Sequence, residues 1–186
     1  MVREGWRMSS TRRASVFGML SAVLLTLATS QATTATLAVP GGSKVLALSP
    51  PVRAALLHAH IKVLFPAVVP LSLEGVGIAA PPATAKAYSL DVVADPECVR
   101  AENVGTACTQ ATVEGKRPAG PTPAGYRPVK LSDDSTGYYH EGPCGANCAG
   151  SFELTFVRWN NRYTIGIKAG TLAQGLAIER GLRLLR

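Results

Sequence analysis

Residues 151–168, Ser-Phe-Glu-Leu-Thr-Phe-Val-Arg-Trp-Asn-Asn-Arg-Tyr-Thr-Ile-Gly-Ile-Lys, carry the pattern that decides the fold. Apolar and polar residues alternate on both sides of the asparagine pair 160–161, which is typical of two half-buried strands. Asparagine tolerates positive φ, so this pair suits a two-residue hairpin turn. That turn would place Glu153 opposite Lys168, a favourable cross-strand pair of charges. The stretch therefore predicts an antiparallel hairpin.

Shorter alternating stretches upstream predict further strands. The apolar run 61–69 is interrupted by a proline and followed by another, which favours an edge strand or an extended segment. Loops rich in glycine, proline and alanine are expected at 74–85 and 115–125. The other predicted strands are 88–92, 107–113, and the pair 126–131 and 136–140, joined by the turn Ser132–Ser135.

Two helices are expected, one before the strands and one after them. Ser49 and the prolines that follow it predict a helix from residue 49 to about residue 60. Thr171 and Gln174 have the spacing of a capping box, which begins a C-terminal helix. The sequence thus predicts an α+β fold, an antiparallel sheet of about five strands with an N-terminal and a C-terminal helix.

The first 38 residues have the three-part order of a secretion signal. Arginines lead, an apolar run covers residues 16–28, and small residues fill 29–38. The apolar run is shorter than the roughly 20 residues of a membrane span. We expect cleavage after Ala38, with Ala32 and Ala35 as alternatives, and the start codon at Met1 or Met8. A single exported domain, residues 39–186, would then lie in the periplasm or outside the cell without a transmembrane anchor.

The net charge indicates whether a nucleic-acid partner is expected. The whole chain carries +7, but the leader holds four arginines and Glu4, which leaves +4 for the remainder. The basic residues of that remainder are scattered through the sequence, apart from Arg180, Arg183 and Arg186 at its end, where cations favour a helix C-terminus. This charge serves solubility and does not indicate a nucleic-acid partner.

The chain has an even number of cysteines, Cys98, Cys108, Cys144 and Cys148, all of them after the leader. In an oxidising compartment they predict two disulfides, with three connectivities open. We favour the local pairs Cys98–Cys108 and Cys144–Cys148. The spacings fit poorly with the close cysteine pairs of structural zinc sites and redox centres, the two competing interpretations.

Tyr138, Tyr139 and His140 form the candidate binding surface. They lie beside the predicted Cys144–Cys148 loop, and aromatic side chains on a rigid support lose little entropy on binding. An envelope protein or a glycan is the expected partner. Alternation along the strand places Tyr138 and His140 on one face and Tyr139 on the other, so one set is expected in the core.

Candidates for catalysis and metal binding are weaker. Ser135 and His140 would lie at opposite ends of one short strand, too far apart for a nucleophile and its base. Asp133 and Asp134 are typical turn formers. His58 and His60 are two residues apart on a predicted helix and would point to different sides. We therefore expect no catalytic residue, cofactor or metal.

One block of the sequence resembles a known family. It comprises Gly137-Tyr138-Tyr139, the Cys-Gly-Ala-Asn-Cys segment 144–148, Trp159 and the segment 163–168. With an upstream Leu-Phe-Pro at 64–66, it is similar to uncharacterised exported bacterial proteins with a Gly-Tyr-Tyr strand, a Cys-Gly-Ala-x-Cys turn and a Trp…Tyr-x-Ile-x-x-Lys hairpin. The resemblance covers residues 49–186 and implies a fold and an exported location, but no activity.

Together these observations predict an exported protein that acts as a non-catalytic binding domain in the cell envelope. A secreted hydrolase or thiol-dependent enzyme is one alternative function. A small inhibitor of extracellular enzymes is another.

Overall fold

The computed structural model describes residues 42–75, 77–100, 107–142 and 151–186. The predicted signal, 1–38, and the predicted Cys144–Cys148 bond lie outside these ranges. No helix within them is long and apolar enough to cross a membrane.

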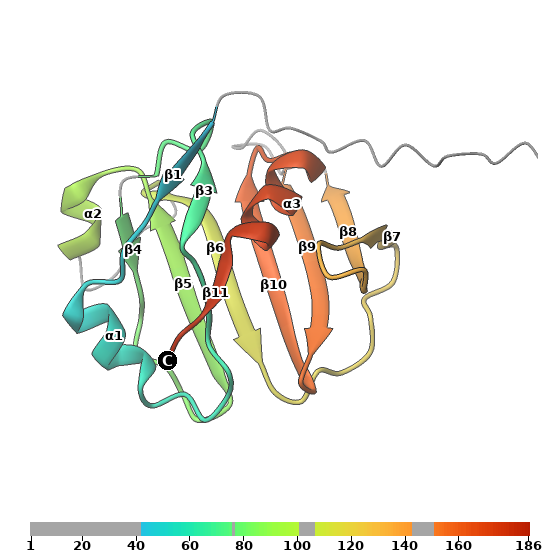
Figure 1. Ribbon diagram of the computed structural model, residues 1–186, viewed down its shortest axis with the longest axis horizontal. Helices are drawn as coiled ribbons and strands as arrows, with labels where there is room; N and C mark the ends of the chain where they lie inside the picture. Colours follow the sequence, from blue (N-terminus) through green and yellow to red (C-terminus); the bar gives the residue numbers. More distant parts are fainter. Residues whose placement is uncertain (1–41, 76, 101–106, 143–150) are drawn as a thin grey trace, which may run out of the picture. The chain divides into compact units, whose positions relative to one another are not determined.

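A seven-stranded antiparallel sheet forms the centre of the fold (Figure 1). Its strand order is β4-β5-β6-β10-β9-β8-β7, so the hairpin of β9 and β10 lies inside the sheet. The strands are β4 Gly77–Ala79, β5 Ala87–Val93, β6 Thr109–Lys116, β7 Arg127–Lys130, β8 Thr136–Gly142, β9 Ser151–Arg158 and β10 Asn161–Lys168.

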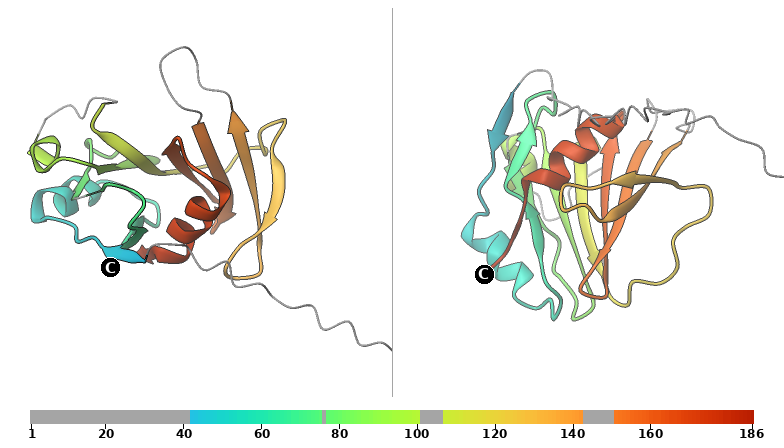
Figure 2. Two further views of the ribbon diagram at one scale, coloured as in Figure 1. Left: turned by 90° about the horizontal axis from the view of Figure 1, so that it is seen from above. Right: turned by 45° about the vertical axis from the view of Figure 1, so that its right-hand side comes forward.

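Short elements from both ends of the described chain cover one face of this sheet (Figure 2). Two two-stranded sheets join segments far apart in sequence, β1 with β3 and β2 with β11. Two helices, α1 and α3, complete this layer. The elements are β1 Ser43–Val45, α1 Pro50–Leu56, β2 Leu64–Pro66, β3 Val68–Pro70, α3 Leu172–Gly181 and β11 Leu182–Leu184.

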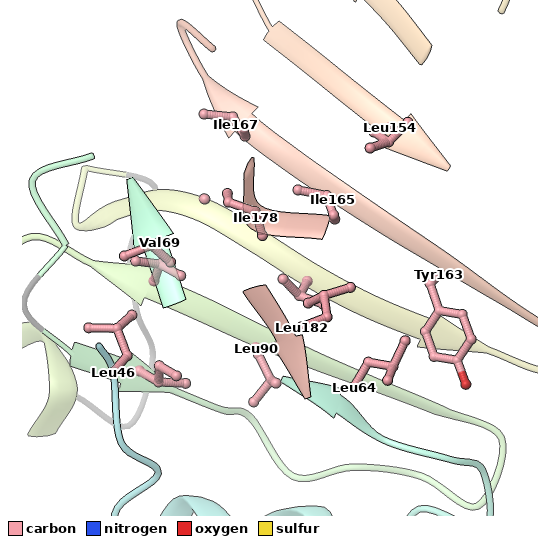
Figure 3. Packing of buried hydrophobic residues seen from close by; sticks show 14 of the residues in the cluster. Leu46, Leu64, Val69, Leu90, Leu154, Tyr163, Ile165, Ile167, Ile178 and Leu182 are labelled. Atoms are coloured by element: carbon pink, nitrogen blue, oxygen red, sulfur yellow. The ribbon is translucent and has the colours of Figure 1, made fainter. Parts of the chain in front are cut away.

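The core fills the space between the sheet and this covering layer (Figure 3). Alternate residues of the long strands point into it, as the periodicity predicts. The sheet contributes Leu90, Val113, Leu154, Phe156, Tyr163, Ile165 and Ile167, and the cover contributes Leu46, Leu56, Leu64, Val69, Ile178 and Leu182. Gly181 allows the close approach of α3 to β3, since a Cβ there would lie 2.1 Å from the Val68 carbonyl oxygen.

The predicted α+β architecture is wrong. The described residues form eleven strands in three sheets and only three short helices, which makes the fold mostly β. The apolar run 61–69 divides into two strands that pair with different partners, and 77–79, expected in a loop, forms β4. α1 and α3 share the covering layer with strands, and the helices build no layer of their own.

The β9–β10 hairpin is confirmed, but its predicted register is wrong. The two-residue turn is Trp159-Asn160, with φ of 52° and 58°, so Asn161 already belongs to β10. Glu153 therefore pairs with Gly166, and Lys168 pairs with Ser151. Each residue of β9 thus pairs with a β10 residue two positions earlier than predicted. Because side chains alternate with a period of two, this shift leaves every side chain on its predicted face. Trp159 makes an edge contact with the Tyr163 ring, and the Lys62 ammonium lies 4.3 Å from the centre of the tryptophan ring.

Other local predictions are confirmed. β7 and β8 pair across the turn 132–135, where Asp134 has φ 65°. The Thr171–Gln174 capping box begins α3. The N-terminal helix, in contrast, ends at Leu56, so His58 and His60 lie beyond it.

Candidate functional site

The second face of the seven-stranded sheet carries the polar residues of every long strand, and we call it the open face. α2, Pro96–Arg100, covers its β4 margin, where Ala79, Val93 and Cys98 form a small separate cluster. The loop 117–126 lies against it on the other side, because the Arg162 guanidinium donates to the Gly120 carbonyl at 2.9 Å. Between them the strand registers place Asp91, Thr112, Glu114, Glu153, Thr155, Thr164, Tyr138 and His140.

Three carboxylates cross the middle of the open face. One row of paired residues runs Asp91, Thr112, Gly166, Glu153, and Glu114 lies in the next row on β6. No lysine or arginine of the described chain forms an ion pair with them. Partial desolvation, followed by repulsion from Glu153 and Asp91, raises the pKa of Glu114, and desolvation raises that of Asp91. The three groups therefore act as one acidic strip.

Aromatic side chains border this acidic strip on the β8 side. The Tyr126 ring stacks on the His140 ring with centroids 5.3 Å apart. Burial, together with the hydrogen bond that the Tyr126 hydroxyl donates to Glu153, raises the pKa of Tyr126 to about 12. Tyr126 thus links the loop 117–126 to the carboxylates.

Thr155 adds a polar group to the same face. Its side chain lies between Thr164 and Tyr138 in the register and is only 2 % exposed. Its hydroxyl has no hydrogen-bond partner in the described part of the chain. A buried hydroxyl without a partner costs free energy.

The structure separates the three residues of the predicted binding surface. Tyr138 and His140 lie on the open face, as the alternation predicts. Tyr139 points to the core side, where it stacks on Phe152 and lies under the Arg127 guanidinium, 4.5 Å from the ring centroid. Only Tyr138 and His140 are therefore placed to share a surface with Glu153.

The cysteine prediction is confirmed for one pair. Cys98 and Cys108 are at disulfide distance, with Cα atoms 5.9 Å apart, and this bond ties α2 to the start of β6. While bonded to each other, these two cysteines are not free ligands for a zinc ion.

The structure does not assemble the residues considered for hydrolysis. The Ser135 hydroxyl donates to Asp133 at the β7–β8 turn, whereas His140 stacks on Tyr126 near the other end of β8. His58 and His60 are both exposed, and no cluster of three metal-binding side chains occurs within the described ranges.

A second polar cluster lies on the covered side of the sheet. Glu179 of α3 has a side chain only 1 % exposed, and it accepts hydrogen bonds from Arg158 at 2.7 Å and from the Ser132 hydroxyl at 3.0 Å. Asp133 also pairs with Arg158, and a shallow hollow of about 470 Å³ opens beside this cluster. Because each of these charges has a partner, the cluster holds α3 against the β7–β8 turn.

Sequence reasoning missed the acidic strip. Asp91, Glu114 and Glu153 each occupy a polar position of an alternating strand, and this is the only signal they carry. Their proximity depends on β10 lying between β6 and β9, a strand order that alternation does not encode.

No family model, curated protein or solved structure matches the chain.

Proposed function

We propose that this protein is an exported, non-catalytic binding domain of the cell envelope that binds a glycan on its open face. The acidic strip carries this proposal, since its three carboxylates lie close together on one face of the sheet, repulsion and partial desolvation raise the pKa of Glu114, and none of the three forms an ion pair with a described lysine or arginine. The proximity of these carboxylates is unfavourable in the unbound protein. Hydrogen-bond donors supplied by a ligand would stabilise them and so favour binding.

The neighbouring side chains suit a sugar. Sugar hydroxyls and amines donate hydrogen bonds, and the strip offers carboxylates beside the hydroxyls of Thr112 and Thr164. The stacked rings of Tyr126 and His140 provide a flat apolar surface at the end of the strip. All but Tyr126 are held on strands of one sheet, so their ordering costs little on binding.

Titration of the purified full chain with oligosaccharides tests this proposal. The probes are a tetramer of N-acetylglucosamine and its deacetylated, cationic counterpart, measured by calorimetry. The double variant Glu114→Gln/Glu153→Gln should weaken binding at least about tenfold, since two charge-assisted hydrogen bonds are lost. Glu74→Gln, an exposed glutamate outside the strands and outside the acidic strip, is the matched control and should bind as the wild type does.

Two results would contradict the glycan proposal. Equal binding by the wild type and the double variant would show that the tetramers do not bind at the acidic strip of the open face. Saturable binding of a purified envelope protein, with no binding of either tetramer, would replace the glycan with a protein partner.

A further inference from the structure

A cluster of cations lies at the end of the sheet where β5 begins and β6 ends. The ladder continues one residue beyond both strands, because the Arg117 amide donates to the Lys86 carbonyl at 2.8 Å. Lys86 and Arg117 therefore stand directly opposite each other. The His60 amide donates to the Ala85 carbonyl at 3.1 Å, which brings the segment after α1 to the same place.

These residues surround a hollow of about 380 Å³, the basic hollow. Its lining consists of His60, Ala85, Lys86, Arg117 and Pro118. The three backbone segments that carry the basic side chains are fixed to one another by main-chain hydrogen bonds. The backbone positions of the three basic residues are thus fixed by main-chain hydrogen bonds.

The charge pattern of the basic hollow is unfavourable for the protein alone. Like charges directly opposite on adjacent strands destabilise a sheet. Within the described ranges, neither Lys86 nor Arg117 has a carboxylate at ion-pair distance, although Arg127 and Lys130 each pair with one. Two adjacent like charges that have no ion-pair partner within the described chain are a feature expected of a binding site.

We propose that the basic hollow binds a phosphate group. Arginine offers parallel N–H donors that match two phosphate oxygens, and lysine adds a compact positive charge. A histidine ring nitrogen supplies a further donor from the third segment. Two fixed cations favour a doubly charged anion over a carboxylate. This proposal is independent of the glycan on the open face, because none of the residues lining the basic hollow belongs to the acidic strip.

The test follows the ring resonances of the two neighbouring histidines by NMR in the purified full chain. Inorganic phosphate is added at constant ionic strength, with chloride as the reference anion. We expect a saturable shift of the His60 resonance and little change at His58, which is exposed in the same segment. Lys86→Gln and Arg117→Gln should each weaken phosphate binding about tenfold. Lys168→Gln, an exposed lysine at the opposite end of β10, should leave it unchanged.

Three outcomes would overturn the proposal: a shift that does not saturate, an equal shift with chloride, or an equal loss in Lys168→Gln. A second arm identifies the source of the phosphate. Vesicles of phosphatidylglycerol and phosphatidylcholine are compared with pure phosphatidylcholine for the wild type and Arg117→Gln. Binding that needs both phosphatidylglycerol and Arg117 assigns a lipid headgroup, whereas phosphate binding without this difference assigns a soluble phosphate compound.

Discussion

The hydroxyl of Tyr88 makes two hydrogen bonds to a single residue, Leu64: it accepts from the amide at 2.8 Å and donates to the carbonyl at 2.9 Å. Both residues are buried, and Tyr88 belongs to β5 whereas Leu64 begins β2. β11 flanks Leu64 on one side only, and the Tyr88 hydroxyl takes the place of a neighbouring strand on the other side. It fixes the covering layer to the sheet.

Tyr88→Phe should lower the free energy of unfolding by about 1–3 kcal/mol, because it leaves a buried amide and a buried carbonyl without a partner. Urea denaturation followed by circular dichroism measures this difference. Tyr138→Phe is the control: it removes a hydroxyl from a half-buried tyrosine on the open face and should change the free energy of unfolding by no more than about 0.5 kcal/mol. Equal effects of the two substitutions would contradict the bridging role of Tyr88.

Glu179→Gln should also destabilise the protein. The buried carboxylate accepts from Arg158 and Ser132, and its neutral analogue leaves the Arg158 charge compensated by Asp133 alone. We expect a loss of about 2–3 kcal/mol, below the usual cost of breaking a buried ion pair because Asp133 remains. Glu141→Gln breaks the exposed pair with Arg127 and should cost about 0–1 kcal/mol, measured by the same denaturation.

The position of the hairpin turn predicts a specific response at Asn160. Its φ of 58° lies in the left-handed region, where alanine is strained by about 1 kcal/mol. Asn160→Ala should therefore lower stability by about that amount, and Asn160→Gly should restore it. If alanine were as stable as asparagine here, the turn would not be Trp159-Asn160.

The acidic strip predicts a pH dependence of stability. The raised pKa values of Asp91 and Glu114 mean that the folded protein holds protons that the unfolded chain has released. The stability contributed by these groups is complete below the ordinary carboxyl pKa and is lost as pH rises through the folded values. Asp91→Asn/Glu114→Gln should thus be more stable than the wild type at pH 7, by at most about 1 kcal/mol, and match it near pH 3.

Asp133→Asn should show a pH dependence of stability opposite in sign to that of the acidic-strip variant. The hydrogen bond from Ser135 lowers the pKa of Asp133, so the stability it contributes is present at neutral pH and lost as pH falls. Thermal unfolding measured at several pH values separates the two variants. Parallel pH profiles for both would contradict the pKa shifts.

Sequence reasoning succeeded where one strand carries its own periodicity. β5, β9 and β10 have seven or eight residues each, long enough for alternation to show. It failed for β2, β3 and β11, since three residues define no period. Their partners are set by tertiary contacts: Leu184 pairs with Leu64, about 120 residues away.

The candidate site divides in the same way. Alternation within β8 correctly separates Tyr139 from Tyr138 and His140. The approach of Glu114 to Glu153 and the basic hollow at Lys86 and Arg117 depend on strand order and on the path of loops. Neither is encoded in the neighbourhood of a single residue.

The pairing of β11 with β2 has a consequence for when the protein can fold. The strand Leu182–Leu184 completes the cover over the sheet, and the Leu185 amide donates to the Val63 carbonyl. Residues 63–66 therefore have no strand partner until synthesis has passed residue 185. We therefore expect closure of the covering layer over the sheet to be a late, long-range docking step.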